Sequence, residues 1–120
     1  MKDRNIKGDL LCVIIAAVLL LNSTSDAAPL TLSAKGASNY QIVIATNAIP
    51  SERYAAEELQ RYLEKITGGK FPMITDGEAI RGREILLGDN GHLRKLGLKI
   101  DCGQLGQESF ILRTDHNRLI

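Results

Sequence analysis

The sequence contains few aromatic residues and no excess of charge of either sign. Of its 120 residues 4% are aromatic, tryptophan is absent, and 15 Lys and Arg residues stand against 14 Asp and Glu residues. A formal net charge of +1 provides no surplus of cations to neutralise a phosphate backbone, so the composition argues against a nucleic-acid partner. A chain of this length forms one small globular domain at most.

Cysteine is also scarce, with only Cys12 and Cys102 in the chain. Cys12 lies in an apolar run that we expect to be removed, and the single remaining thiol excludes an intrachain disulfide. No histidine or other general base is placed beside Cys102 in any known catalytic pattern. We therefore interpret Cys102 as a small loop or core residue rather than a nucleophile.

The chain has one long hydrophobic run, near its start. A weakly basic stretch over residues 1–9 precedes twelve apolar residues, 10–21, and a polar stretch then leads to Ala27-Ala28-Pro29. This order is typical of a secretory signal peptide. Twelve residues form about 18 Å of helix, which is too short for a hydrocarbon core of about 30 Å. We predict a signal peptide over residues 1–27, cleaved between Ala27 and Ala28; the alternative is an uncleaved anchor. The protein is then secreted or periplasmic and meets the membrane only through this signal.

Short apolar and β-branched segments, separated by turn residues, predict strands. The expected strands are residues 30–34, 40–45, 71–75 and 83–88, followed by a hairpin of 109–114 and 118–120 around a three-residue turn. Pro72 favours an edge position or a strand start. A turn at 89–91 leads into a single helical turn over 92–98 that closes on Gly97.

The clearest element is a helix over residues 51–67, which begins at the candidate N-cap Ser51 and stops at Gly68-Gly69. Glu57 and Arg61 are four residues apart, in the favourable order for a surface ion pair. Apolar residues at helical spacing predict one buried face, formed by Ala55, Leu59, Tyr62, Leu63 and Ile66. The residues expected to point outward are Glu57, Arg61, Glu64 and Lys65.

These elements predict an α/β (α+β) fold, with a mixed β-sheet and one major helix packed on one face. The other face must meet solvent, a later helix or another domain. The last expected strand stops at Leu119-Ile120 without a turn residue or a polar run. We therefore expect the fold to be incomplete at the C-terminus.

Several of these segments together resemble a known domain. Ile42-Val43-Ile44-Ala45, residues 49–63 with their Ala-Ala-Glu-Glu-Leu motif, and Ile66-Thr67-Gly68 resemble the N-terminal domain of alpha-glucuronidases and the similar hexosaminidase-type domain. Residues 83–88 and 106–120 resemble later strands of the same domain. These domains belong to large bacterial exported glycoside hydrolases.

The resemblance implies a mixed sheet that precedes a (β/α)8 barrel, and it implies that the catalytic carboxylates lie in that barrel. No catalytic residue, metal ligand or cofactor is carried over to this chain, and the implied partner is the barrel, with carbohydrate as a further possible ligand. The domain in this family continues with another strand and a second helix. On this basis residues 28–120 are predicted to be a truncated accessory domain.

The side chains that most often carry chemistry form no recognisable constellation in the sequence. Glycoside hydrolysis needs two carboxyl groups about 5 to 10 Å apart across a sugar, whereas Glu57 and Glu58 are adjacent in a helix and point to different sides. Residues 87–91 lack the Lys-Ser/Thr of a phosphate-binding loop. The remaining candidates are interpreted as structural: Asp89, Asp101, His92 and His116 as loop residues, and Tyr54 and Tyr62 as core or domain interface rather than a sugar-stacking platform.

Three functions follow as alternatives. The first is a noncatalytic N-terminal accessory domain of an exported carbohydrate-active glycoside hydrolase, whose uncovered sheet face docks on the barrel. The second is a free-standing secreted carbohydrate-binding or interaction module, whose binding residues the sequence does not identify. The third is a small exported enzyme, for which no catalytic set is visible.

Overall fold

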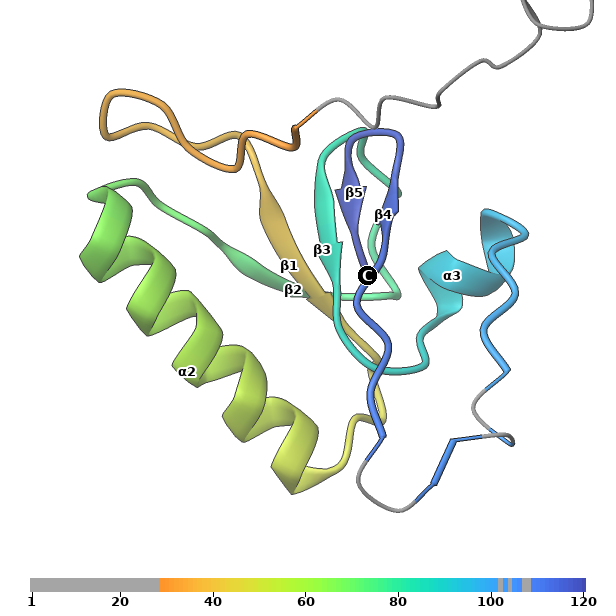
Figure 1. Cartoon of the computed structure of the whole chain (residues 1–120). Helices are drawn as coiled ribbons and strands as arrows, with labels where there is room; N and C mark the ends of the chain where they lie inside the picture. Colours follow the sequence, from red (N-terminus) through yellow and green to blue (C-terminus); the bar gives the residue numbers. More distant parts are fainter. Residues whose placement is uncertain (1–28, 102, 104, 107–108) are drawn as a thin grey trace, which may run out of the picture.

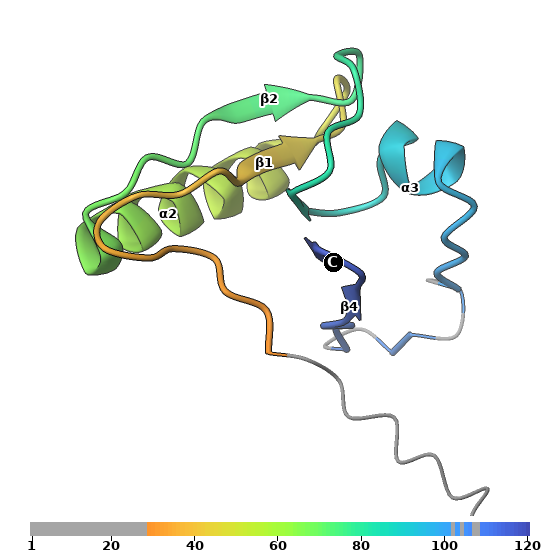
Figure 2. The ribbon, with the colours of Figure 1, turned by 90° about the horizontal axis from the view of Figure 1, so that it is seen from above.

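The computed structural model describes residues 29–101, 103, 105, 106 and 109–120. The predicted signal peptide, its cleavage point between Ala27 and Ala28, and Cys102 lie outside the described residues. Figure 1 shows a sheet with a long helix, α2 (Pro50–Thr67), against one face and a short helix, α3 (Gly91–Lys95), on the other side. The view from above (Figure 2) shows the two helices on opposite sides of the strands.

Five strands form one mixed sheet in the order β2-β1-β3-β5-β4. β1 (Gln41–Ile44) pairs in parallel with β2 (Met73–Thr75) and with β3 (Glu84–Leu86). β5 (Arg118–Leu119) continues the parallel sheet beside β3, and β4 (Thr114–Asp115) is antiparallel to β5. The predicted α/β fold, with a mixed sheet and one main helix on one face, is therefore confirmed.

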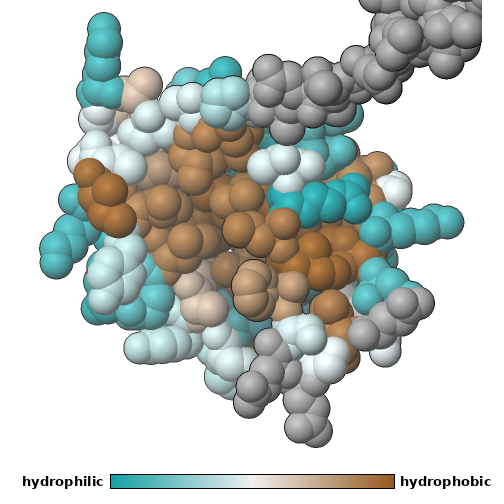
Figure 3. Space-filling model, in the orientation of Figure 1, coloured by the Kyte–Doolittle hydropathy of each residue, from teal (hydrophilic) through white to brown (hydrophobic). Residues whose placement is uncertain are grey.

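Side-chain alternation along the strands divides the core into two apolar clusters. The cluster on the α2 side is formed by Tyr40, Ile42, Ile44, Ala45, Ala48, Ala56, Phe71 and Ile85. The cluster on the α3 side is formed by Val43, Leu86 and Leu93. In the space-filling view, apolar side chains reach the surface between α2 and β5 (Figure 3), so α2 covers only part of its own face of the sheet.

The start of α2 differs from the prediction. Pro50 is the first helical residue and Ile49 is the N-cap, so Ser51 does not cap the helix. Pro suits this position because its missing N–H has no partner in the first turn. Glu52 reaches back, and its Oε2 accepts the backbone N–H of Ile49 at 3.1 Å. The helix ends, as predicted, at Gly68, whose φ of 72° places it in the left-handed region.

The buried face of α2 is only partly the face that the apolar spacing predicts. Leu59 and Leu63 pack against the α2-side core, as predicted, but Ala55 is exposed. Ala56 is fully buried, whereas Tyr62 is 51% exposed and Ile66 is 77% exposed. The segment that follows the helix contacts its Gln60 side, where the Gln60 side chain donates to the carbonyl oxygen of Phe71 at 2.7 Å.

Two charged residues of α2 also have different partners from those expected. Glu64, predicted to point outward, accepts the backbone N–H of Phe71 at 3.2 Å. That hydrogen bond, followed by the one from Lys70, lowers the pKa of Glu64. Arg61 pairs with Glu58 at 2.6 Å rather than with Glu57.

The strand expected at residues 30–34 is absent from the sheet. Ala34 and Ala37 form an isolated antiparallel bridge around a tight turn, in which Lys35 and Gly36 both have positive φ. Leu30 and Leu32 pack against the α2-side core through their side chains. Apolar alternation in this segment therefore reflects burial without strand pairing.

The expected hairpin is present as β4 and β5, with backbone hydrogen bonds of 2.8 Å in both directions between Arg113 and Ile120. Its first strand is much shorter than the predicted 109–114, because β4 begins only at Thr114 and residues 109–113 are not in a strand. Its turn comprises two residues, His116 and Asn117, instead of three. The helical turn before Gly97 is α3. Within the described residues, no helix is long and apolar enough to cross a membrane.

Candidate functional site

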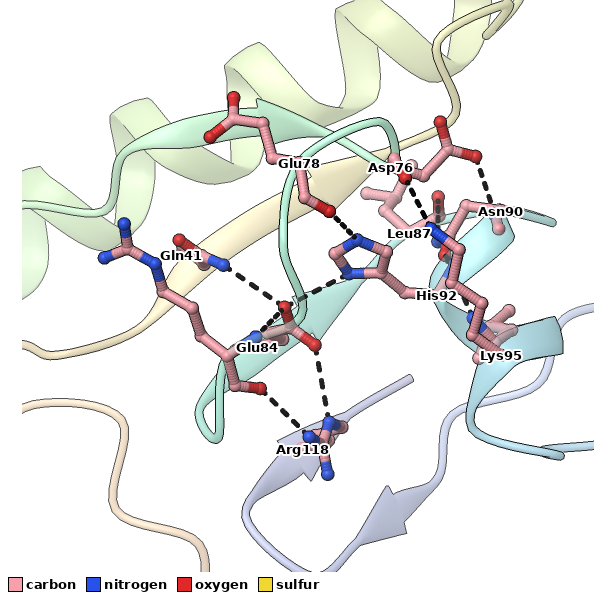
Figure 4. Close-up of polar contacts among 12 residues, drawn as sticks. Gln41, Asp76, Glu78, Glu84, Leu87, Asn90, His92, Lys95 and Arg118 are labelled. Atoms are coloured by element: carbon pink, nitrogen blue, oxygen red, sulfur yellow. Dashed lines mark hydrogen bonds and ion pairs between the residues drawn. The ribbon is translucent and has the colours of Figure 1, made fainter.

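A buried carboxylate at the start of β3 is the centre of the largest polar network. The side chain of Glu84 is fully buried, and Gln41 faces it across the parallel pairing of β1 and β3. Glu84 Oε1 accepts from Gln41 Nε2 at 3.2 Å and from the backbone N–H of Arg81 at 2.9 Å. The same oxygen lies 3.1 Å from Nδ1 of His92 (Figure 4). A buried carboxylate requires such partners, because the loss of hydration is otherwise very costly.

Arg118 supplies the positive charge that faces this carboxylate. Its Nε lies 3.4 Å from Glu84 Oε2, and its Nη2 donates to the carbonyl oxygen of Arg81 at 2.9 Å. Arg118 belongs to β5, which pairs with β3 through Ile85 and Leu119. The ion pair therefore links β5 of the C-terminal hairpin to β3 in the middle of the sheet.

His92 connects the network to α3. The side chain of Asn90 caps this helix, since its Oδ1 accepts the backbone N–H groups of His92 at 3.0 Å and Leu93 at 3.3 Å. The His92 ring is fully buried, and its Nε2 lies 2.9 Å from the carbonyl oxygen of Glu78. The interpretation of His92 as a loop residue is wrong, because its ring is part of the core.

Asp76 forms a second polar junction, at the carboxyl ends of β1 and β2. Its Oδ1 accepts from Thr46 Oγ1 at 2.7 Å and from the Thr46 N–H at 2.9 Å. Its Oδ2 accepts the N–H of Gly91, the first residue of α3, at 2.7 Å. The hydrogen bond from the Thr46 hydroxyl, followed by the one from Gly91, lowers the pKa of Asp76 to about 2. The carboxylate thus joins two strand ends to α3.

The glycine-containing segment 87–91 does not form an anion-binding loop. Gly88 has a φ of +70°, and a Cβ added to it would lie 2.8 Å from Oε1 of Glu52. The carboxylate of Glu52, in the first turn of α2, therefore lies against Gly88. The carboxylate of Asp76 lies at the other end of the segment, at Gly91. Two carboxylates beside segment 87–91 disfavour the binding of a phosphate group to it.

A groove of about 760 Å³ lies on the α3 side of the sheet. Its apolar lining is formed by Leu86, Leu93, Leu98, Ile100, Ile111 and Ile120. Charged residues at its rim include Asp89 and Arg94, which form an exposed ion pair at 2.8 Å. A mostly apolar hollow with a charged rim is suited to an apolar side-chain surface rather than to a free sugar.

The other residues considered from the sequence do not gather at this groove in a catalytic arrangement. Glu57 is exposed on α2, and Glu58 is paired with Arg61. Asp101 lines the groove and accepts the N–H of Gly103 at 3.0 Å. His116 is an exposed residue of the hairpin turn, as predicted. Within the described residues, no group of three or more His, Cys, Asp or Glu side chains is placed to hold a metal ion.

The two tyrosines of α2 are on the surface. Tyr54 is 65% exposed and Tyr62 is 51% exposed, so neither is a core residue; of the two predicted roles, the domain interface stays a prediction. The guanidinium of Arg61 lies 5.2 Å from the centre of the Tyr62 ring. That contact covers one side of the ring and leaves Tyr54 as the more accessible aromatic side chain of the helix.

Sequence reasoning did not identify Glu84, Gln41 or Arg118 as members of a common network. The available signal was a charged or amide residue at the first position of β1, β3 and β5, directly before an apolar pair. Such a residue is buried if its strand lies in the middle of a sheet, and its polar side chain then needs a hydrogen-bond or ion-pair partner.

Comparison with known proteins identifies no relative of this chain. No family model matches the chain, and neither the curated proteins nor the solved structures include a match.

Proposed function

We propose that this chain is a noncatalytic accessory domain of an exported carbohydrate-active glycoside hydrolase, and that its groove on the α3 side receives an apolar surface of the catalytic barrel. The observation that carries the proposal is the apolar groove of about 760 Å³ on the face opposite α2. The resemblance of residues 42–68, 83–88 and 106–120 to N-terminal domains of such enzymes supports the same assignment.

The hydrogen bonds that Glu84 and Asp76 make within the chain favour a noncatalytic role. Glu84 is buried and surrounded by donors from its own chain, and Asp76 accepts three hydrogen bonds. A glycosidase needs one carboxyl group that can give up a proton and a second one that faces the sugar. Glu84 and Asp76 are engaged in holding strands, loops and α3 together, which leaves neither free for this work.

The alternative function is a free-standing carbohydrate-binding or interaction module. The exposure of Tyr54 and Tyr62 on α2 favours it, because sugar rings stack on accessible aromatic faces. The contact of Arg61 with the Tyr62 ring argues against a pair of free stacking faces. The accessory role is therefore preferred.

The coding DNA beyond the codon for Ile120, together with two assays on the purified chain, tests the proposal. We expect an in-frame continuation that encodes the alternating strands and helices of a barrel, and we expect the purified chain to leave model glycosides intact. Hydrolysis of a model glycoside that depends on Glu84 or Asp76 would contradict the noncatalytic role. A stop codon after Ile120, combined with sugar binding that is lost in Tyr54→Ala, would establish the alternative.

A further inference from the structure

The two ring nitrogens of His92 both face oxygen atoms. Nε2 lies 2.9 Å from the carbonyl oxygen of Glu78, which can only accept a hydrogen bond. Nδ1 lies 3.1 Å from Glu84 Oε1. A neutral imidazole has one N–H, so it can donate to only one of these two oxygens.

The surroundings of Glu84 decide which group holds the second proton. The backbone N–H of Arg81 and the guanidinium of Arg118 can only donate, and Gln41 presents its amide nitrogen. A carboxylate without a proton can accept from all of these donors and from His92 as well. A protonated Glu84 would instead have to place its hydrogen on an already crowded oxygen or toward the Arg118 guanidinium.

We propose that His92 carries protons on both ring nitrogens and acts as a proton-dependent clamp that holds α3 against the sheet. In this state one nitrogen donates to Glu84 on β3 and the other to the 76–83 loop, through the Glu78 carbonyl. When the ring loses one proton, the unprotonated nitrogen of His92 becomes an acceptor that faces an acceptor oxygen, and both atoms are buried. The clamp therefore contributes while His92 is protonated and is lost as the pH rises.

The charges around the ring are consistent with an imidazolium. The carboxylate of Glu84 faces it directly from β3, and the carboxylate of Asp76 accepts the N–H of the neighbouring Gly91. Arg118 on β5 approaches the far oxygen of Glu84 rather than the ring, and β1 contributes the neutral Gln41. On α3 itself, Lys95 extends to the carbonyl oxygen of Asp76 at 3.5 Å.

Release of the clamp would affect the groove. Leu93, which follows His92 in α3, lines the groove, and Leu98 of the same wall donates its N–H to the Leu93 carbonyl at 3.0 Å. Opening of α3 therefore loosens one wall of the groove. This conformational device does not depend on what the groove binds.

Nitrogen NMR on the ¹⁵N-labelled full chain tests the proton count directly. Long-range ¹H–¹⁵N spectra distinguish an imidazolium from each neutral tautomer. At pH 7.5 we expect two protonated ring nitrogens for His92; the other histidine of the chain, His116, has a side chain that is 84% exposed and gives the second set of imidazole signals. The variant His116→Gln assigns the signals. A neutral His92 at this pH, in either tautomer, would overturn the proposal.

Hydrogen exchange in the same sample tests the clamp. The N–H of Leu96 donates to the His92 carbonyl at 2.9 Å, and the N–H of Leu98 donates to Leu93. Once the pH is high enough to remove one His92 proton, we expect opening at these two amides to increase about tenfold, after correction for intrinsic exchange. Amides in the middle of α2 serve as the control and should show no matching change. Unchanged opening at Leu96 and Leu98 would show that the ring does not act as a clamp.

Discussion

Neutralising Asp76 should destabilise the protein above pH 4 and have little effect at pH 2. The pKa of Asp76 is lowered from 3.8 to about 2 in the folded chain. One pKa unit corresponds to about 1.4 kcal/mol, so this difference sets an upper bound of about 2.5 kcal/mol. Because the side chain is partly exposed, solvent screening reduces the expected contribution to about 1 kcal/mol. A lowered carboxyl pKa stabilises the fold above the unfolded value, and this stability is lost as the pH falls from about 4 to 2.

Urea unfolding followed by circular dichroism measures this contribution. Wild type and Asp76→Asn are compared at pH 5 and at pH 2, with Asp89→Asn as the control because Asp89 forms only an exposed ion pair. We expect Asp76→Asn to lose about 1 kcal/mol at pH 5 and to approach the wild type at pH 2. The control should change by less than about 0.5 kcal/mol at either pH. An equal loss for Asp76→Asn at both pH values would refute the electrostatic explanation.

Three further tests, which use five substitutions, examine the packing and the buried ion pair in urea unfolding experiments at pH 7. Phe71→Ala should cost about 3 to 5 kcal/mol because the ring is fully buried, whereas Phe110→Ala, at an exposed ring, should cost less than about 0.5 kcal/mol; similar losses would contradict the core assignment. Gly88→Ala should cost more than Gly97→Ala: both place alanine at a positive φ, which costs about 1 kcal/mol, but only Gly88→Ala adds a close contact, 2.8 Å from the Glu52 carboxylate. Equal losses for the two glycines would show that this contact is unimportant. Arg118→Met should cost about 3 kcal/mol, because it removes the cation that faces a buried carboxylate, and a loss below about 1 kcal/mol would show that the network does not need that charge.

Much of the fold was predictable because its signals are local. The β-branched segment 40–45 and the apolar end of 83–88 form β1 and β3 at the centre of the sheet. Pro72 stands directly before β2, which is an edge strand. Gly68 ends α2 in the left-handed conformation that favours glycine. Each of these features depends on a few neighbouring residues, so spacing and turn chemistry were sufficient.

The errors arose where distant contacts decide the outcome. The inward side of α2 is in contact with Phe71, whose backbone engages both Gln60 and Glu64 after the chain has reversed direction. Segment 30–34 alternates like a strand but does not pair with the sheet, and it contributes the side chains of Leu30 and Leu32 to the core. Helical and strand periodicity describe which residues are apolar, and they do not state which neighbour each apolar side chain will meet.

The candidate site was the least predictable part of the molecule. Glu84 and His92 are eight residues apart, with a strand end and a helix cap between them. Arg118 joins them only because β5 pairs beside β3. No spacing rule relates a strand residue, a helix residue and a hairpin residue, so the network becomes visible only when the three elements are packed.

The proposed accessory role is tested most directly by calorimetric titration of this chain with the barrel domain that the proposal expects the same gene to encode, expressed separately. Wild type is compared with Ile111→Asp, which places a charge in the groove, and with Phe110→Asp, which places the same charge on the neighbouring exposed residue. We predict saturable binding by wild type and by Phe110→Asp, and at least about tenfold weaker binding by Ile111→Asp, because a charge cannot be buried unpaired in an apolar contact. Absence of binding by the wild type, or equal binding by all three chains, would contradict the account.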